Sequence, residues 1–175
     1  MPEPDAFECF CTLILKYLPR YYTNNVEGAY DGLHLVPFCL NEVDPVLFAH
    51  LTKCDFHYET LLEFVLSLGS SNPPLEETLK LWDFLFAFGF QMVPLIPVAY
   101  LVRDRAKLLA KRPMAVLYNS RDVTLDARVI CDLMCLFAKS LPAGLWELLI
   151  HHTYDLDYHK SVERYIKYLD CEEKE

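Results

Sequence analysis

The chain has 175 residues, of which 53% are apolar and 14% aromatic, and its formal net charge is −9. This is enough apolar material for one packed domain, and it excludes a disordered chain, in which hydrophobicity is low and net charge high. An acidic chain without a basic patch lacks the positively charged surface that binds nucleic acid or an anionic membrane. The charge is compatible with a basic protein partner.

Three features bear on the compartment. The first ten residues, MPEPDAFECF, lack the basic and apolar regions of a secretory signal peptide. The longest apolar run, residues 92–102, contains two prolines and is too short to span a bilayer. The seven Cys are an odd number, which favours free thiols over a disulfide framework. We therefore expect a soluble cytoplasmic protein with no membrane insertion.

Apolar residues recur at helical spacing along nearly the whole chain, and no segment reads clearly as a strand. The first helix is predicted over residues 5–18, with Asp5 as its N-cap and Pro19 as its stop. Its apolar face consists of Phe7, Phe10, Leu13, Ile14 and Tyr17.

The next helices are expected at residues 31–41, 45–54 and 58–68. Pro37 should kink the first of them, because an interior proline removes a hydrogen bond. Asp44 followed by proline is a typical N-cap for the second. Residues 69–74, GSSNPP, form the clearest loop in the chain.

The stretch LEETLKLWDFLFAFG at positions 75–89 predicts an amphipathic helix closed by Gly89. Residues 112–122 are expected to connect the two helices on either side of them, and Thr124 to cap the second of these. The remaining helices are predicted at residues 94–111, 125–140 and 142–152, and from Asp155 or Asp157 onward. We therefore predict one all-α domain over residues 1–170 and a charged tail at 171–175.

Two pairs of Cys residues, Cys9/Cys11 and Cys131/Cys135, have spacings that raise the question of a metal site. Cys9 and Cys11 lie two positions apart on a predicted helix, so their side chains point in nearly opposite directions. Cys131 and Cys135 share a helix face with Met134, which favours core thiols over a metal site. The chain has no phosphate-binding glycine loop, no H-E-x-x-H and no G-x-S-x-G, so we expect neither a cofactor nor a catalytic residue.

Two polar features have simple structural explanations. His151 and His152 close a predicted helix, where the macrodipole favours a cation, so we favour a structural role over a catalytic one. The basic run at residues 103–112 is interpreted as the solvated face of a helix in preference to a binding patch for a partner.

The stretch PPLEETLKLWDFLFAFG at residues 73–89 resembles the [L/V]-x-R-x-W-D-x-x-[F/L]-x-x-G signature of TBC domains, the Rab-type GTPase-activating modules. Trp82, Asp83 and Gly89 match its fixed positions, and Lys80 stands where the family often has Arg.

Other blocks extend the resemblance to residues 3–155. Asp5, Ala6 and Phe7 are similar to the family's E-x-D-A-F-W-x-F block, with Glu8 where Trp is usual. Residues 44–68 resemble the stretch that begins with D-P-x-L-x-x-H-L, and residues 130–155 resemble the closing helices of fungal TBC proteins that restrain mitotic exit and septation.

The resemblance implies a multi-helix orthogonal array, the C-terminal lobe of a TBC domain. It places Trp82, Phe86, Phe64 and Leu85 in the core. It makes the Trp-Asp helix a packing element, in which Asp83 would accept hydrogen bonds from the backbone or a basic side chain, because a buried carboxylate must be paired.

The family activates GTP hydrolysis with an arginine from an I-x-x-D-x-x-R block and a glutamine from a Y-x-Q block. Neither block occurs here, and the single glutamine, Gln91, does not follow a tyrosine by two positions. Arg103 and Arg105 are the least implausible substitutes for the arginine. We therefore expect a lobe without its catalytic N-terminal partner, and an exposed apolar patch on the helix at 5–18, where the family places that lobe.

The resemblance implies part of an activator of a small Ras-like GTPase in cell-cycle or mitotic-exit control, with a separate scaffold subunit. It is compatible with association with the cytoskeleton or spindle pole. A non-catalytic helical interaction module is the main alternative, and a metal- or cofactor-dependent enzyme is a third.

Overall fold

The computed structural model describes residues 2–23, 25–110 and 124–158, together with residues 160, 162 and 165. The first half contains α1 (Glu3–Thr12), the π-helix η1 (Leu13–Tyr17), α2 (Glu27–Val43), α3 (Pro45–Lys53), the 3-10 helix η2 (Tyr58–Leu61) and α4 (Leu62–Leu66). The second half contains α5 (Leu75–Phe88), the 3-10 helix η3 (Phe90–Met92), α6 (Leu95–Arg103), α7 (Arg105–Ala110), α9 (Ala127–Ser140) and α10 (Ala143–His151). The described residues contain helices and no strand, so the all-α prediction is confirmed.

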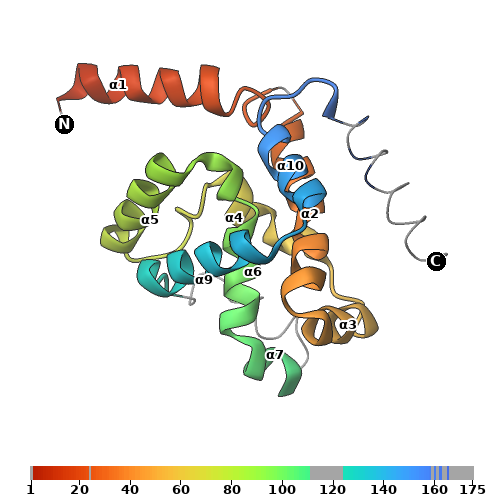
Figure 1. The fold of residues 1–175 in the computed structure, drawn as a ribbon. Coiled ribbons are helices and arrows are strands. Elements are labelled where there is room, and N and C mark those ends of the chain that lie inside the picture. Colours follow the sequence, from red (N-terminus) through yellow and green to blue (C-terminus); the bar gives the residue numbers. More distant parts are fainter. Residues whose placement is uncertain are drawn as a thin grey trace.

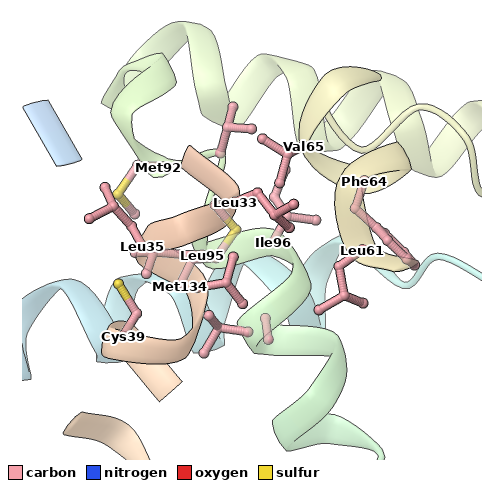
Figure 2. Close-up of a cluster of buried hydrophobic side chains, with 14 of the residues drawn as sticks. Leu33, Leu35, Cys39, Leu61, Phe64, Val65, Met92, Leu95, Ile96 and Met134 are labelled. Atoms are coloured by element: carbon pink, nitrogen blue, oxygen red, sulfur yellow. The ribbon is translucent and has the colours of Figure 1, made fainter. Parts of the chain in front are cut away.

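Helix α6 lies at the centre of the molecule (Figure 1). Its residues from Leu95 to Leu101 are all buried, and a helix that is apolar all round is expected to be enclosed by its neighbours. Pro94 is its N-cap and Pro97 lies in its first turn, where the backbone has no intrahelical hydrogen bond to lose. Side chains from α2, α4 and α9 pack against those of α6, as Figure 2 shows.

Several helices begin or end at residues other than those predicted from the sequence. Helix α2 begins before residue 31 and continues through Pro37 to Val43. The single helix expected at 58–68 is a 3-10 turn followed by the short α4. The connector at 112–122 and the tail at 171–175 lie outside the described residues.

The helix predicted over 94–111 is interrupted at Asp104, which corrects the sequence-based expectation. The buried Asp104 carboxylate accepts hydrogen bonds from Arg103 Nη2 at 2.8 Å and Lys107 Nζ at 2.7 Å. Burial alone would raise the pKa of Asp104, but these two cations hold it below its usual value. The backbone at Asp104 leaves the helical region, with φ −93° and ψ 14°, so Asp104 is the C-cap of α6 and α7 begins at Arg105.

Of two N-caps predicted from the sequence, one is confirmed and the other is wrong. Asp44 caps α3 as predicted, since its Oδ1 accepts from the Leu47 amide at 2.9 Å. Thr124 does not cap α9; Asp126 does so, because its carboxylate accepts from the Val129 amide at 3.1 Å. Glu77 of α5 adds a second acceptor, at 2.8 Å from the Ala127 amide, and so ties α5 to the start of α9.

Helix α1 projects from the rest of the molecule (Figure 1). It contains no buried residue. Among the residues that the structure describes, no helix combines the length and apolarity needed to cross a membrane.

Candidate functional site

The Trp-Asp pair of α5 divides between core and solvent. Trp82 is partly buried, and its Nε1 donates a hydrogen bond to the Leu68 carbonyl oxygen at 3.1 Å, which fastens α5 to the end of the α4 segment. Asp83 is exposed, so the predicted buried and paired carboxylate is wrong. The reason is geometric, because successive helix positions are about 100° apart and the face after Trp82 turns to water.

The predicted core residues of this region also divide. Phe64 and Leu85 are buried, as expected, and Trp82 lies at the edge of the core. Phe86 is 55% exposed, which contradicts its predicted core position. Its ring lies edge-on to Trp82 at a centroid distance of 6.4 Å and to the buried Phe90 at 5.2 Å. Phe86 therefore covers two aromatic neighbours without being covered itself.

The backbone at the C-terminal end of α5 adopts a conformation that favours glycine at position 89. Its φ of 105° and ψ of 152° lie in a region that is essentially restricted to glycine. A Cβ at Gly89 would collide with the Gln91 side chain, whose Nε2 donates to the Phe88 carbonyl oxygen at 2.9 Å. Gln91 thus satisfies a carbonyl at the helix C-terminus.

The other signature residues lie on α1. Asp5, Ala6 and Phe7 are all exposed, and Phe7 is 67% exposed. Asp5 is not the N-cap, because α1 begins at Glu3 after Pro2, with no side-chain cap. The structure does not bring these three residues together with the α5 signature into one site.

Arg103 and Arg105 are both engaged in structural contacts. Arg103 pairs with Asp104, donates through Nη1 to the Thr124 carbonyl oxygen at 3.1 Å, and lies over the Tyr100 ring at 4.5 Å. Arg105 Nε donates to Oδ2 of Asp44 at 2.6 Å, which links α7 to the start of α3. Each side chain is held in place by contacts within the chain.

A buried polar cluster around Arg20, which the sequence does not predict, joins distant parts of the described chain. Arg20 is only 2% exposed, and its Nη2 pairs with Oδ2 of Asp31 at 2.6 Å. Its Nη1 donates to the His152 carbonyl oxygen at 2.9 Å, and its guanidinium lies 5.2 Å from the Tyr158 ring centroid. Arg20 therefore joins the loop after η1, α2 and the end of α10, segments that no local pattern connects.

His152 is buried, and its imidazole lies between two oxygens. Nδ1 is 2.6 Å from the Leu149 carbonyl oxygen and must donate to it, so Nε2 accepts from the Tyr21 hydroxyl at 2.8 Å. Burial is the main cause that lowers the pKa of His152 to about 4; the hydrogen bond to Leu149 opposes this shift and the nearby Arg20 adds to it. The expected macrodipole-stabilised cation is therefore wrong for His152, which is neutral.

The lack of a side chain at Gly32 leaves room for the contact between Tyr21 and His152. A Cβ at Gly32 would lie 3.0 Å from the Tyr21 hydroxyl oxygen and 3.1 Å from Nε2 of His152. The neighbouring His151 is part-exposed, with Nδ1 3.3 Å from Oδ2 of Asp155. The sequence signal that could have marked the cluster is a glycine one turn after another glycine, at Gly28 and Gly32, inside a helix.

The six thiols among the described residues are free cysteines. Cys131 and Cys135 are partly buried, and burial raises the pKa of Cys131 to about 11. Cys9 is exposed and Cys11 partly buried. Within the described part of the chain, no group of three or more His, Cys, Asp or Glu residues could hold a metal ion.

Residues 1–109 match the model of the Rab-GTPase-TBC domain family, which is more than half of the chain. The chain belongs to this family. The TBC match includes α1 and α5, and therefore all six signature residues.

Three proteins similar to this chain have names that refer to mitosis or cell division. The chain is 36% identical over 152 residues to a putative mitotic check point protein BUB2 of Dictyostelium discoideum, covering 87% of this chain and 41% of that protein. It is 36% identical to the mitotic check point protein BUB2 of Saccharomyces cerevisiae, covering 89% and 51%. It is 30% identical to the cell division control protein 16 of Schizosaccharomyces pombe, covering 93% and 54%.

The chain therefore spans about half the length of the curated relatives it matches. No solved structure matches the chain.

Proposed function

We propose that this chain is a non-catalytic part of a GTPase-activating protein for a small Ras-like GTPase of the Rab type, acting in mitotic-exit control. The match of residues 1–109 to the TBC family carries the proposal. The names of the three relatives support the cell-cycle assignment. A scaffold subunit, a cytoplasmic location and association with the cytoskeleton or spindle pole belong to the same proposal.

The chain supplies scaffold and binding surface, and the chemistry comes from residues outside it. An arginine supplied by an activator is worth roughly 10³–10⁵ in rate, because it stabilises charge in the transition state. The two arginines considered as substitutes are held by Asp104 and Asp44, and Gln91 caps α5. An arginine in a strong internal ion pair has to give up that partner before it can reach a phosphate.

The domain assignment forms part of this proposal. Residues 1–170 are one C-terminal lobe and 171–175 a charged tail, and the catalytic N-terminal lobe packs beside α1. The exposed Phe7 and Phe10 support this placement, since an apolar helix face without a cover is a typical interaction surface.

Single-turnover GTP hydrolysis on a panel of Ras-like GTPases tests the proposal, together with binding of the chain to each GTPase in the GTP-analogue state. We expect binding to at least one member without stimulation beyond about tenfold. Stimulation above that level, lost in Arg103→Ala or Arg105→Ala, contradicts the non-catalytic assignment. Absence of binding to every member favours the alternative, a helical interaction module without a GTPase.

The genomic sequence upstream of Met1 provides a second test. In-frame I-x-x-D-x-x-R and Y-x-Q blocks there support a longer catalytic protein. The longer protein should then stimulate hydrolysis, and the arginine of its D-x-x-R block should be required.

A further inference from the structure

An apolar stripe runs along the outer side of α5 from its first turn to its last. It consists of Leu75, Leu79, Trp82 and Phe86, which we call the α5 stripe. The spacing i, i+4, i+7, i+11 places these residues within about 60° of one another around the helix. Leu75 is 67% exposed, Leu79 57% and Phe86 55%, and Trp82 is partly buried.

The fold uses only the inner edge of this stripe, through Trp82 and one side of the Phe86 ring. The buried residues of α5 are Thr78, Leu81 and Leu85, which lie on a different side of the helix and pack inward. Trp82 is held by its hydrogen bond to Leu68, and Phe86 packs edge-on against Phe90. The stripe is therefore a supported apolar surface whose outer side remains in water.

The charges beside the stripe are acidic. Glu76 and Asp83 are exposed on its solvent side. Lys80 is the only basic residue of α5, and its Nζ lies 2.5 Å from Oε1 of Glu77, so an acid already offsets its charge. Helix α5 thus carries three acids near the stripe, Glu76, Glu77 and Asp83, against the single base Lys80.

We propose that the α5 stripe is a docking site for an amphipathic helix of a partner protein, with apolar residues on one face and Lys or Arg along its edges. A helix lies along such a surface through apolar anchors spaced about one turn apart. Basic edges meet Glu76 and Asp83, and this complementarity selects the partner and orients it. The proposal goes beyond the action on a GTPase and does not depend on it.

Charge excludes helix α1 of a second copy as the occupant. Helix α1 exposes Phe7 and Phe10, but its charged residues are Glu3, Asp5 and Glu8, with no base. Docking α1 of a second copy on the stripe would place acids beside acids, which opposes association. A basic helix faces no such repulsion.

Trp82 provides a direct signal. The chain has two tryptophans, so Trp146→Phe leaves Trp82 as the only fluorophore of this type. The probe is a synthetic helical peptide of about 18 residues, long enough to cover α5. It carries Leu at i, i+4, i+7 and i+11 and Lys at the flanking positions, and a second peptide carries Glu in place of every Lys.

We expect the Lys peptide to bind the full chain with a blue shift of Trp82 emission, and the Glu peptide to bind at least about tenfold more weakly. Leu79→Ser with Phe86→Ser should weaken the Lys peptide by at least about tenfold. Phe88→Ser is the matched control: Phe88 is 57% exposed on the same helix but outside the stripe, and its loss should change affinity less than about twofold.

Equal binding of the two peptides, or unchanged binding to the Leu79→Ser/Phe86→Ser variant, would overturn the proposal. Sedimentation of the chain alone tests whether a second copy of the chain occupies the stripe. A dimer that the same double substitution dissolves, and that Phe88→Ser leaves intact, would assign the stripe to a second copy and contradict a basic partner helix. An unchanged thermal unfolding midpoint in each variant shows that the substitutions act on the surface.

Discussion

The Tyr21 hydroxyl donates a hydrogen bond to Nε2 of His152 at 2.8 Å, across 131 positions of the chain and inside the protein. The same histidine donates from Nδ1 to the Leu149 carbonyl oxygen, so its neutral form satisfies both ring nitrogens. The two side chains join the N-terminal segment to the end of α10. Their contact makes the stability of this junction depend on pH.

Lowering the pH from about 6.5 to about 4 should destabilise the protein through His152. The unfolded chain binds a proton near pH 6.5, whereas burial lowers the pKa in the folded protein to about 4. The free energy of unfolding therefore falls with pH across this window, by at most about 3 kcal/mol from this one residue. Chemical denaturation at several pH values measures it. In His152→Gln the slope attributable to this residue should vanish, and an unchanged slope would refute the assignment.

Removing one partner of the buried Arg20–Asp31 pair should be costly. Arg20→Met leaves the Asp31 carboxylate buried without its cation, and we expect a loss of about 3–5 kcal/mol in the free energy of unfolding. The double variant Arg20→Met/Asp31→Leu should recover part of that loss, because no charge is left unpaired. Lys80→Met, which breaks an exposed pair, is the control and should change stability little. A double variant no more stable than Arg20→Met would show that the ion pair itself is not the cause.

Gly89→Ala should destabilise the end of α5. The backbone conformation of Gly89 costs about 1–3 kcal/mol for a residue with a Cβ, and that Cβ also meets the Gln91 side chain. Thermal and chemical unfolding measure the loss. Combining Gly89→Ala with Gln91→Ala removes the collision and leaves the backbone strain, so the double variant should recover only part of the stability. Full recovery would show that the dihedral angles do not matter here.

The exposed face of α1 should make the isolated chain associate. Phe7 and Phe10 are 67% and 49% exposed on a helix of ten residues without a buried position. So short a helix is marginal in water unless another surface covers it. Sedimentation should show self-association that Phe7→Ser/Phe10→Ser reduces. Leu156→Ser, at a residue that is 86% exposed outside α1, is the control. A monomeric wild-type chain under the same conditions would contradict this prediction.

Local features were predictable where one short stretch contains the whole cause. The helical class follows from apolar spacing, and the Asp44 cap follows from an acidic residue before proline. Gly89 at the end of α5 follows from the apolar run that stops there. The family resemblance rested on the order of several such stretches, and the match over residues 1–109 confirms it.

Errors arose where two neighbouring apolar residues competed for the interior. The pattern of α5 does not distinguish Phe86 from Leu85, yet the fold buries Leu85 and leaves Phe86 over half exposed. The family resemblance implies a buried Asp83 with hydrogen-bond donors around it, but Asp83 faces solvent. The side of α5 that becomes interior depends on where α9 and η3 lie, and the sequence of α5 alone contains no information about that.

The sequence by itself determined that this is an all-α member of the TBC family, because helix period, caps and signature order are properties of short segments. Only the tertiary structure decided that Arg20 and His152 share a buried cluster, 132 positions apart, and that α1 and the α5 stripe remain uncovered. The physical reason is that a buried charge needs a partner and an apolar face needs a cover, and both come from distant parts of the chain. Which faces find a cover is settled only when the helices pack together.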